Sequence, residues 1–532
     1  MSATLSDTER DEFMEAAGQG MTLAYWAARQ PDVPAIIGDH GDRTYAELNA
    51  HANQLVRALR ERGVSEGDSL ALMCANRPQF AEAMGATLRS GLRLTTINWH
   101  LTGEEAGYIL DDCEAKVFVA DARFAEAAKA ALDHAPNATV RICVGGDIEG
   151  FETFESVIEG QDPSNIDDAV VGGQMLYTSG TTGRPKGVNR PRTPDAAKLV
   201  AVAMLTGPTN YEPGVSVNLC TGPLYHAAPL AFSLATPLLA GATVVLMDGW
   251  TAADTLQLIE EHKVTHIHMV PTMFHRLLSL PSDVKDAADI ESVHYIIHGA
   301  APCPVVVKQG IIEWFGPVVN EYYAATEGAG TTIGSKEWLE KPGTVGKPPT
   351  PDHVRILDEE GTDLSANEIG TVYLKAPPGR FEYYKDPEKT ASSYRDTHYT
   401  LGDVGYLDED GYLFLTDRSA NLIISGGVNI YPAEVEAELI GHPAVGDVAV
   451  IGVPDDEWGE VVVAVVEPQP DVEPTAELAA ELVAFARERL AHYKCPRRVD
   501  FRGELPRHDN GKLYKRLLRD EYRAAQAEEA SK

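Results

Sequence analysis

The sequence predicts an α/β protein, with a large N-terminal domain of helix-covered, mostly parallel sheets plus a small β-barrel-like part, and a small mobile α+β C-terminal domain. From about residue 22, short apolar runs alternate with helical patterns, which is typical of parallel sheets covered by helices. From about residue 350, strand-like runs are joined by turn pairs instead, and a compact tail begins near residue 420. The length of 532 residues also predicts more than one hydrophobic core.

The first part of the chain carries the alternation. Its strand-like runs are residues 34–39, 68–76, 116–121, 139–146, 243–248 and 265–271. Residues 45–63 and 251–264 place apolar side chains at three- and four-residue spacing, which predicts helices. Together these segments predict parallel strands with helical connections.

The pattern changes in the second part. The pairs Glu360-Gly361 and Asp410-Gly411 lie between apolar runs and predict antiparallel hairpins. The tail contains, in order, a predicted helix at 432–440, strands at 447–454 and 461–468, and a long helix at 476–491. We therefore expect a large domain over residues 1–418 and a small one over residues 419–532.

The net charge limits the partners that the protein can bind, and the cysteine content indicates its cellular compartment. The formal net charge is −35 and the pI is about 4.8, so most of the surface repels the phosphates of nucleic acids and of anionic lipids. The six cysteines are far apart and form no C-x-x-C pair, which indicates reduced thiols in a cytoplasmic protein. The first twenty residues are polar and acidic, and they lack the pattern of a signal peptide.

One segment is long and uncharged enough to be mistaken for a membrane span, residues 227–247. Pro229, Pro237 and Gly241 interrupt it, so we interpret it as a core helix, a turn and a buried strand. We expect no stable membrane span, while peripheral membrane contact stays open.

A loop for phosphates is the first candidate site. Residues 177–188 read YTSGTTGRPKGV, in which glycines let backbone amides and hydroxyl groups surround phosphate oxygens, with Lys186 as a mobile countercharge. A Walker A loop needs Gly directly before its Lys and Ser or Thr directly after it, whereas Pro185 and Gly187 occupy those places. Taken alone, the stretch is equally compatible with an ordinary glycine-rich loop.

Three later stretches add groups that a nucleotide site needs. Glu327, which follows Thr326, offers oxygen ligands for Mg²⁺. Asp403 lies between glycines and can accept two hydrogen bonds from a ribose diol, and Arg418 can donate to the same sugar or its phosphate. Lys512 lies in a basic segment near the end of the chain. Each of these residues, taken alone, also fits a solvated surface position.

Two histidines raise the question of a metal site. His266 and His268 share one face of a predicted strand, and imidazole is a common zinc ligand. Because no third ligand lies nearby in the sequence, we interpret them as core or pocket histidines.

Five motifs, taken in order and at these separations, resemble the adenylate-forming superfamily of acyl-CoA synthetases, adenylation domains and firefly luciferase. They are YTSGTTGRPKG at 177–187, YYAATEG at 322–328, LGD at 401–403, DRSANLIISGGVNIYPAEVE at 417–436 and NGK at 510–512. The resemblance extends from about residue 22 to residue 520. It implies that a carboxylate attacks the α-phosphorus of ATP and expels pyrophosphate, after which a thiol, usually that of coenzyme A, displaces AMP. The loop would then hold the β- and γ-phosphates.

The resemblance also implies roles for individual residues. The pyrophosphate loop corresponds to Thr178, Ser179, Gly180, Thr181, Thr182, Gly183 and Lys186. The rest of the ATP site corresponds to Gly299, Ala300, Ala301 and Tyr323 around adenine, Thr326 at a phosphate, Glu327 at Mg²⁺, and Asp403 with Arg418 at the ribose. The implied catalytic residues are Lys512, which would bridge the carboxylate and the α-phosphate, with Glu327, Thr182, Lys186 and His226. His226 and Ala324 would border the acyl substrate, and Gly426 and Gly427 would approach coenzyme A after the small domain rotates.

Two positions depart from the family pattern. Ala420 stands where the hinge residue is usually Lys or Asp, which leaves its effect on the rotation open. Ala324 stands where many relatives have Gly, and its methyl group would narrow the acyl pocket slightly. The Trp of acetate-specific enzymes is absent there, so acetate is not the expected acid.

We therefore predict an AMP-forming ligase that acts on a medium- or long-chain fatty acid, with ATP, Mg²⁺ and coenzyme A. An aryl- or steroid-acid ligase, a free-standing enzyme that loads a carrier protein, and a luciferase-like oxygenase stay open as alternatives. So does a homodimer.

Overall fold

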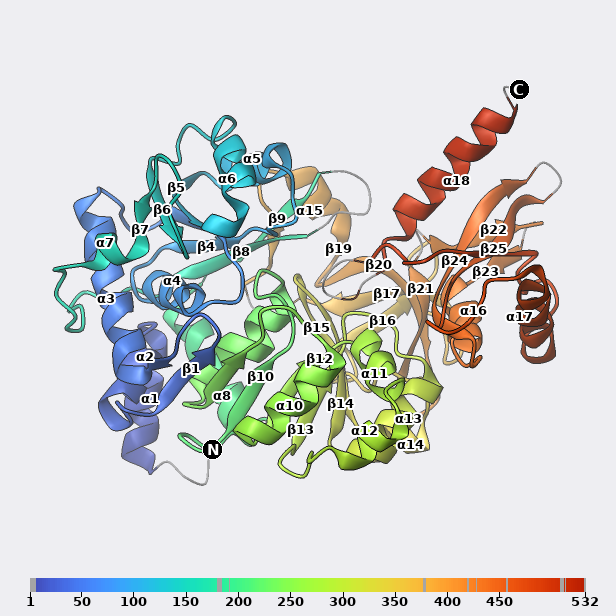
Figure 1. The fold of residues 1–532 in the computed structure, drawn as a ribbon, viewed down its shortest axis with the longest axis horizontal. Helices are drawn as coiled ribbons and strands as arrows, with labels where there is room; N and C mark the ends of the chain where they lie inside the picture. Colours follow the sequence, from blue (N-terminus) through green and yellow to red (C-terminus); the bar gives the residue numbers. More distant parts are fainter. Residues whose placement is uncertain are drawn as a thin grey trace. The chain divides into compact units, whose positions relative to one another are not determined.

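Figure 1 shows the computed structural model, which describes residues 6–178, 184–190, 192–376, 379–418, 421–426, 428–455, 458–507, 511 and 513–530. The chain forms two compact units. Unit 1 consists of residues 1–268, 281–296 and 378–390, and unit 2 of residues 269–280, 297–377 and 391–532.

The first sheet of unit 1 has the strand order β18-β9-β8-β4-β3-β5-β6-β7. Its strands are β3 (Ser69–Met73), β4 (Arg93–Thr96), β5 (Ala115–Asp121), β6 (Val140–Val144), β7 (Glu152–Thr153), β8 (Gly173–Thr178), β9 (Lys186–Asn189) and β18 (Glu382–Tyr383). The pairs from β8 through β4, β3, β5 and β6 to β7 are parallel, whereas β9 and β18 pair antiparallel at the edge. The prediction of parallel strands is confirmed.

Helices connect and cover these strands, as the alternation predicted. They are α3 (Tyr45–Glu61), α4 (Pro78–Arg89), α5 (Gly103–Asp112), α6 (Ala125–Leu132) and α7 (Phe154–Ile158). A capping box begins α3, in which the Glu47 backbone N–H donates to Thr44 Oγ1 at 3.2 Å and the Thr44 N–H donates to Glu47 Oε2 at 2.9 Å. A capping box also begins α5 at Thr102. Helices α5 and α6 pack on β5 (Figure 1).

The strands of the second sheet that lie in unit 1 run in the order β12-β10-β11-β1-β2. Its strands are β1 (Pro34–Gly38), β2 (Arg43–Thr44), β10 (Val217–Cys220), β11 (Thr243–Leu246) and β12 (His266–Met269). All pairs are parallel except β1 with β2. This unit also contains α1 (Asp7–Gly18), α2 (Thr22–Arg29), α8 (Pro194–Thr206), α10 (Ala252–His262) and α12 (Ser282–Ala287).

The uncharged segment at 227–247 folds as the sequence predicted. A π-helix at Pro229–Ala235 continues into α9 (Thr236–Leu239), and a turn leads to β11. No helix in the described part of the chain is both long and apolar enough to cross a membrane.

Unit 2 carries antiparallel strands and the C-terminal tail. Strands β14 (Val319–Ala325) and β15 (Gly328–Gly334) form a hairpin, preceded by β13 (Tyr295–His298), α11 (Pro271–Leu278) and α13 (Val305–Phe315), and followed by α14 (Ser335–Glu340). An antiparallel sheet β16-β17-β20-β19, with β21 on β20, contains β16 (Val354–Leu357), β17 (Gly370–Lys375), β19 (Tyr394–Arg395), β20 (His398–Leu407) and β21 (Leu413–Arg418). The turn Asp410-Gly411 joins β20 to β21 as predicted, whereas Glu360-Gly361 lies in a longer connection between β16 and β17.

The tail builds its own α+β layer, as predicted. Its sheet runs β23-β22-β25-β24, with β26 on β25. The elements are β22 (Ile423–Ser425), β23 (Val428–Ile430), α16 (Pro432–Leu439), β24 (Val445–Asp455), β25 (Gly459–Pro468), α17 (Ala476–Arg489), β26 (Arg498–Phe501) and α18 (Lys515–Ala530). Buried valines and leucines of α16, α17 and the strands form its core.

Candidate active site

Two residues of unit 2 that the sequence assigned to the nucleoside lie on strands of different sheets. Tyr323 lies on β14, and its hydroxyl group donates a hydrogen bond of 2.6 Å to Oδ2 of Asp403 on β20. Asp403 is only 7% exposed, and its Cα is opposite that of Arg418 in the β20–β21 pair. The structure therefore brings together an aromatic ring and a carboxylate, the two groups that the sequence assigned to adenine and ribose.

The segment Gly299–Ala301 follows β13 and approaches β14 closely. A Cβ atom on Gly299 would lie 2.7 Å from both the carbonyl oxygen and the ring of Tyr322, so this close approach requires glycine. Ala300 adopts a left-handed conformation with φ of 68°, which is rare for a residue with a side chain. A backbone held in this way fits a turn that presents its peptide groups to a ligand.

Thr326 and Glu327 form the turn between β14 and β15. Glu327 is 6% exposed. Mg²⁺ in nucleotide sites is usually held by one or two carboxylates together with substrate phosphates, so a buried carboxylate fits that ion. Among the described residues there is no group of three His, Cys, Asp or Glu side chains that could hold a metal without a substrate.

The flanks of the predicted phosphate loop lie in unit 1. The Cα atoms of Thr178, the last residue of β8, and Lys186, the first of β9, are directly opposite each other. On one flank, the Tyr177 hydroxyl donates to Oδ2 of Asp112 at 2.5 Å. On the other, the Tyr108 hydroxyl donates to the Pro185 carbonyl at 3.2 Å. Helix α5 therefore anchors both ends of the loop.

Lys186 has a partner that the sequence reasoning missed. Its Nζ forms an ion pair with Oδ2 of Asp386, which lies directly before α15 (Pro387–Ser393). The sequence Asp386-Pro387-Glu388 carries the signal of a helix start, since Asp is a common N-cap and Pro a common first helical residue. That signal predicts the start of the helix. It does not predict the ion pair, because Lys186 on β9 is 200 residues away in the sequence.

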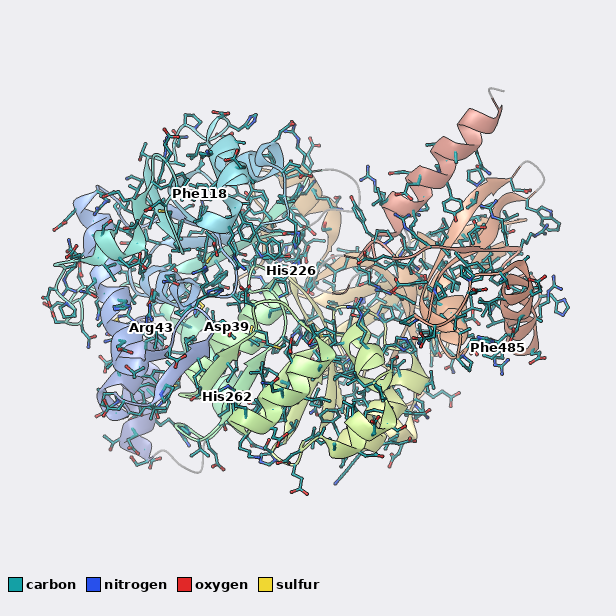
Figure 2. All side chains as sticks on the ribbon, in the orientation of Figure 1. Asp39, Arg43, Phe118, His226, His262 and Phe485 are labelled. Carbon is teal, nitrogen blue, oxygen red and sulfur yellow. The ribbon has the colours of Figure 1, made fainter. Side chains whose placement is uncertain are left out.

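Other predicted site residues are placed individually. His226, labelled in Figure 2, lies between β10 and the π-helix, and its ring centroid is 4.5 Å from that of Tyr225. Ala324 is half-buried on β14, and Gly426 turns between β22 and β23 with φ of 58°. Residues that lie outside the described part of the chain are Ser179, Gly180, Thr181, Thr182, Gly183, Ala420, Gly427 and Lys512.

The two histidines of β12 are core residues, as the sequence suggested. His266 stacks on Tyr211 with ring centroids 3.9 Å apart, and its Nε2 lies 2.6 Å from the Thr209 carbonyl. His268 stacks on Phe232 at 5.5 Å. Burial lowers the pKa of each histidine to about 4. Both imidazoles are therefore neutral at neutral pH.

These histidines predict acid sensitivity. Since their folded-state pKa lies below the unfolded value of about 6.5, the unfolded chain binds more protons as the pH falls below that value. The free energy of unfolding should fall by about 2 kcal/mol for each histidine between pH 7 and pH 5. In the variant His268→Phe, thermal denaturation should therefore show a smaller loss of stability over this pH range. The matched control is His294→Phe, which changes an exposed histidine of the same unit. An unchanged pH dependence in His268→Phe would contradict the prediction.

Comparison with known proteins agrees with this geometry. Residues 23–384 match the family described as AMP-binding enzyme, and residues 434–512 match the AMP-binding enzyme C-terminal domain. A feruloyl-CoA synthase of Amycolatopsis sp is 33% identical over 503 residues, which cover 93% of this chain and 98% of that protein. A long-chain-fatty-acid–CoA ligase of Mycobacterium tuberculosis (strain CDC 1551 / Oshkosh) is 32% identical over 522 residues, which cover 95% and 98%. The crystal structure of the anthranilate CoA ligase AuaEII in complex with anthranoyl-AMP is similar with a TM-score of 0.86 and 26% identity, covering 96% of this chain and 98% of that one.

Proposed function

The chain belongs to the family of AMP-binding enzymes, and we propose that it activates a carboxylic acid with ATP and transfers the acyl group to coenzyme A. In the first step the acid displaces pyrophosphate from ATP and forms an acyl-adenylate. In the second step the thiol of coenzyme A displaces AMP and forms a thioester. Similarity to three acid–CoA ligases over almost the whole chain supports this proposal.

The hydrogen bond between Tyr323 and Asp403 is the observation that carries the proposal. It fixes an aromatic ring beside a buried carboxylate at 2.6 Å. The ring can stack on adenine, and the carboxylate can accept hydrogen bonds from both ribose hydroxyl groups. An AMP moiety is common to ATP, to the acyl-adenylate and to the product, so one such site serves both steps.

The remaining residues take roles according to their chemistry. We assign the phosphates to Thr178, the loop 179–183, Lys186 and Thr326, and the ribose also to Arg418. We assign to Lys512 the stabilisation of the negative charge that develops at the α-phosphate, since a fixed cation stabilises such a transition state. Gly299, Ala300 and Ala301 would border adenine, and Gly426 with Gly427 would approach coenzyme A. In this proposal residues 419–532 move between the two steps around Ala420.

Glu327 would hold Mg²⁺ together with the phosphates of ATP. The ion would supply positive charge that neutralises the leaving pyrophosphate. A single buried carboxylate suits this role, because substrate oxygens and water complete the six oxygen ligands that Mg²⁺ prefers.

For the acid, we propose a medium- or long-chain fatty acid. The fatty-acid ligase among the relatives supports an aliphatic chain, whereas the feruloyl and anthranilate enzymes keep an aromatic acid as the alternative. We also propose a cytoplasmic location, from the acidic composition and the separate cysteines.

Mass spectrometry of the products tests the reaction and the substrate together. The enzyme is incubated with ATP, Mg²⁺, coenzyme A and a panel of straight-chain, aromatic and sterol acids. We expect AMP and fatty acyl-CoA. If aromatic or sterol acyl-CoA forms instead, the substrate is an aromatic or sterol acid and not the proposed fatty acid. Acyl-adenylate without thioester would favour an enzyme that loads a carrier protein, and ADP as the nucleotide product would contradict the proposed reaction.

A further inference from the structure

Lys186, the lysine of the phosphate loop, is paired with the carboxylate of Asp386. Each side chain is 31% exposed, so water screens this pair only partly. An ammonium group has three N–H donors and can turn from one acceptor to another. The Asp386 carboxylate therefore competes with any other anion for the Lys186 ammonium group.

Asp386 is held in place by its own surroundings. Its Oδ1 accepts a hydrogen bond of 2.9 Å from the backbone N–H of Lys389. Two residues earlier, the Tyr384 N–H donates to the Gly187 carbonyl at 2.8 Å, and β18 pairs with β9. The segment that carries Asp386 is thus bonded to the strand that begins with Lys186.

The charge of Asp386 follows from these contacts. The Lys186 ammonium and then the Lys389 N–H hold the pKa of this carboxyl below its usual range. The neighbouring Lys385 is directed elsewhere, with its Nζ 3.5 Å from Oε1 of Glu114. A polyphosphate bound by Lys186 would therefore meet a negative charge beside the same ammonium, and like charges repel.

We propose that Asp386 is the counter-ion that Lys186 exchanges for the phosphates of ATP, and that it thereby lowers the affinity for ATP and pyrophosphate. This inference rests on the proposed function, because it places Lys186 at the phosphates. Without nucleotide, Asp386 keeps the ammonium neutralised and close to the loop. With nucleotide, its negative charge opposes the phosphates and favours the release of pyrophosphate.

The variant Asp386→Asn tests this exchange. The asparagine keeps an oxygen that can accept from the Lys389 N–H, so the start of α15 is preserved while the charge is lost. We expect the dissociation constants for Mg·ATP and for Mg·pyrophosphate, measured by titration calorimetry on the full chain, to fall about two- to fivefold. Release of pyrophosphate should slow by a similar factor, while the KM for the acid is unchanged.

Two further variants serve as controls for a general charge effect and for the route through Lys186. Asp289→Asn removes the same charge from a Lys263–Asp289 ion pair of 2.8 Å in unit 1, and it should leave both constants unchanged. In a Lys186→Met background, Asp386→Asn should no longer tighten binding, because the effect passes through the ammonium group.

The outcomes separate this inference from the function on which it rests. If the unaltered protein binds ATP but Asp386→Asn binds it equally or more weakly, the exchange is wrong and the function stands. The same is true if Asp386→Asn tightens binding equally in the Lys186→Met background. If the unaltered protein binds neither Mg·ATP nor Mg·pyrophosphate, the proposed function fails, and the inference fails with it.

Discussion

Replacing Lys512 by alanine is expected to slow acyl-adenylate formation by at least about a hundredfold, because a lost charge donor at a transition state costs about 10²–10³ in rate. Thioester formation from supplied acyl-adenylate should stay within about twofold, since the proposed role of Lys512 ends when pyrophosphate leaves. Rapid-quench measurement of pyrophosphate release, beside the conversion of synthetic acyl-adenylate with coenzyme A, separates the two steps.

The residues around Lys512 make this variant interpretable. The Arg507 guanidinium pairs with both carboxylate oxygens of Asp447 at 2.5 and 2.6 Å, and it donates to the Gly511 carbonyl at 2.6 Å. The anchor next to Lys512 is thus made by other side chains and survives its truncation. Arg516→Ala, which removes a half-exposed cation of the same basic segment, is the matched control and should leave both steps unchanged. Equal loss of both half-reactions in Lys512→Ala would contradict the assignment.

Much of the fold could be predicted because it depends on local patterns. The apolar runs at 116–121 and 139–146 became β5 and β6, and the three- and four-residue spacing at 45–63 became α3. The site could be predicted in part for a similar reason. The motif 322–328 placed Tyr323 and Glu327 on one short segment. The structure brings Oδ2 of Asp403, which the sequence also named, to 2.6 Å from the Tyr323 hydroxyl group, and the roles of these residues stay predictions.

What the sequence missed depends on contacts between distant segments. Asp386 reads as a helix cap, and only the pairing of β18 with β9 brings it to Lys186. Glu321 is a charged residue next to Tyr322 in a strand, and nothing in the neighbouring sequence indicates that its side chain is buried. Its ion pair with Lys308 arises because α13 packs on β14. Propensity and periodicity describe one segment at a time, so neither could supply these partners.

The Lys308–Glu321 pair is a buried ion pair of unit 2. The Nζ of Lys308 lies 2.5 Å from Oε2 of Glu321, and the side chains are 0% and 6% exposed. The Lys308 ammonium also lies 4.6 Å from the centre of the Trp338 ring. Burial lowers the pKa of Lys308 and raises that of Glu321, so each charge depends on the other. The pair links α13 to the strand that carries Tyr323.

Removing one partner of this pair should therefore destabilise the protein strongly. We expect Lys308→Met to lower the free energy of unfolding by about 3–5 kcal/mol, because it leaves the carboxylate buried without its counter-ion. The double variant Lys308→Met with Glu321→Leu should recover most of that loss, since two apolar side chains of similar length replace the pair. Denaturation of both variants, beside the exposed control Lys336→Met, measures the difference. A double variant at least as unstable as Lys308→Met would contradict this prediction. Because β14 also carries Tyr323, Lys308→Met should raise the KM for ATP more than the KM for the acid. If the double variant recovers both the stability and the KM for ATP, the unpaired buried charge, and not lost packing, is the cause.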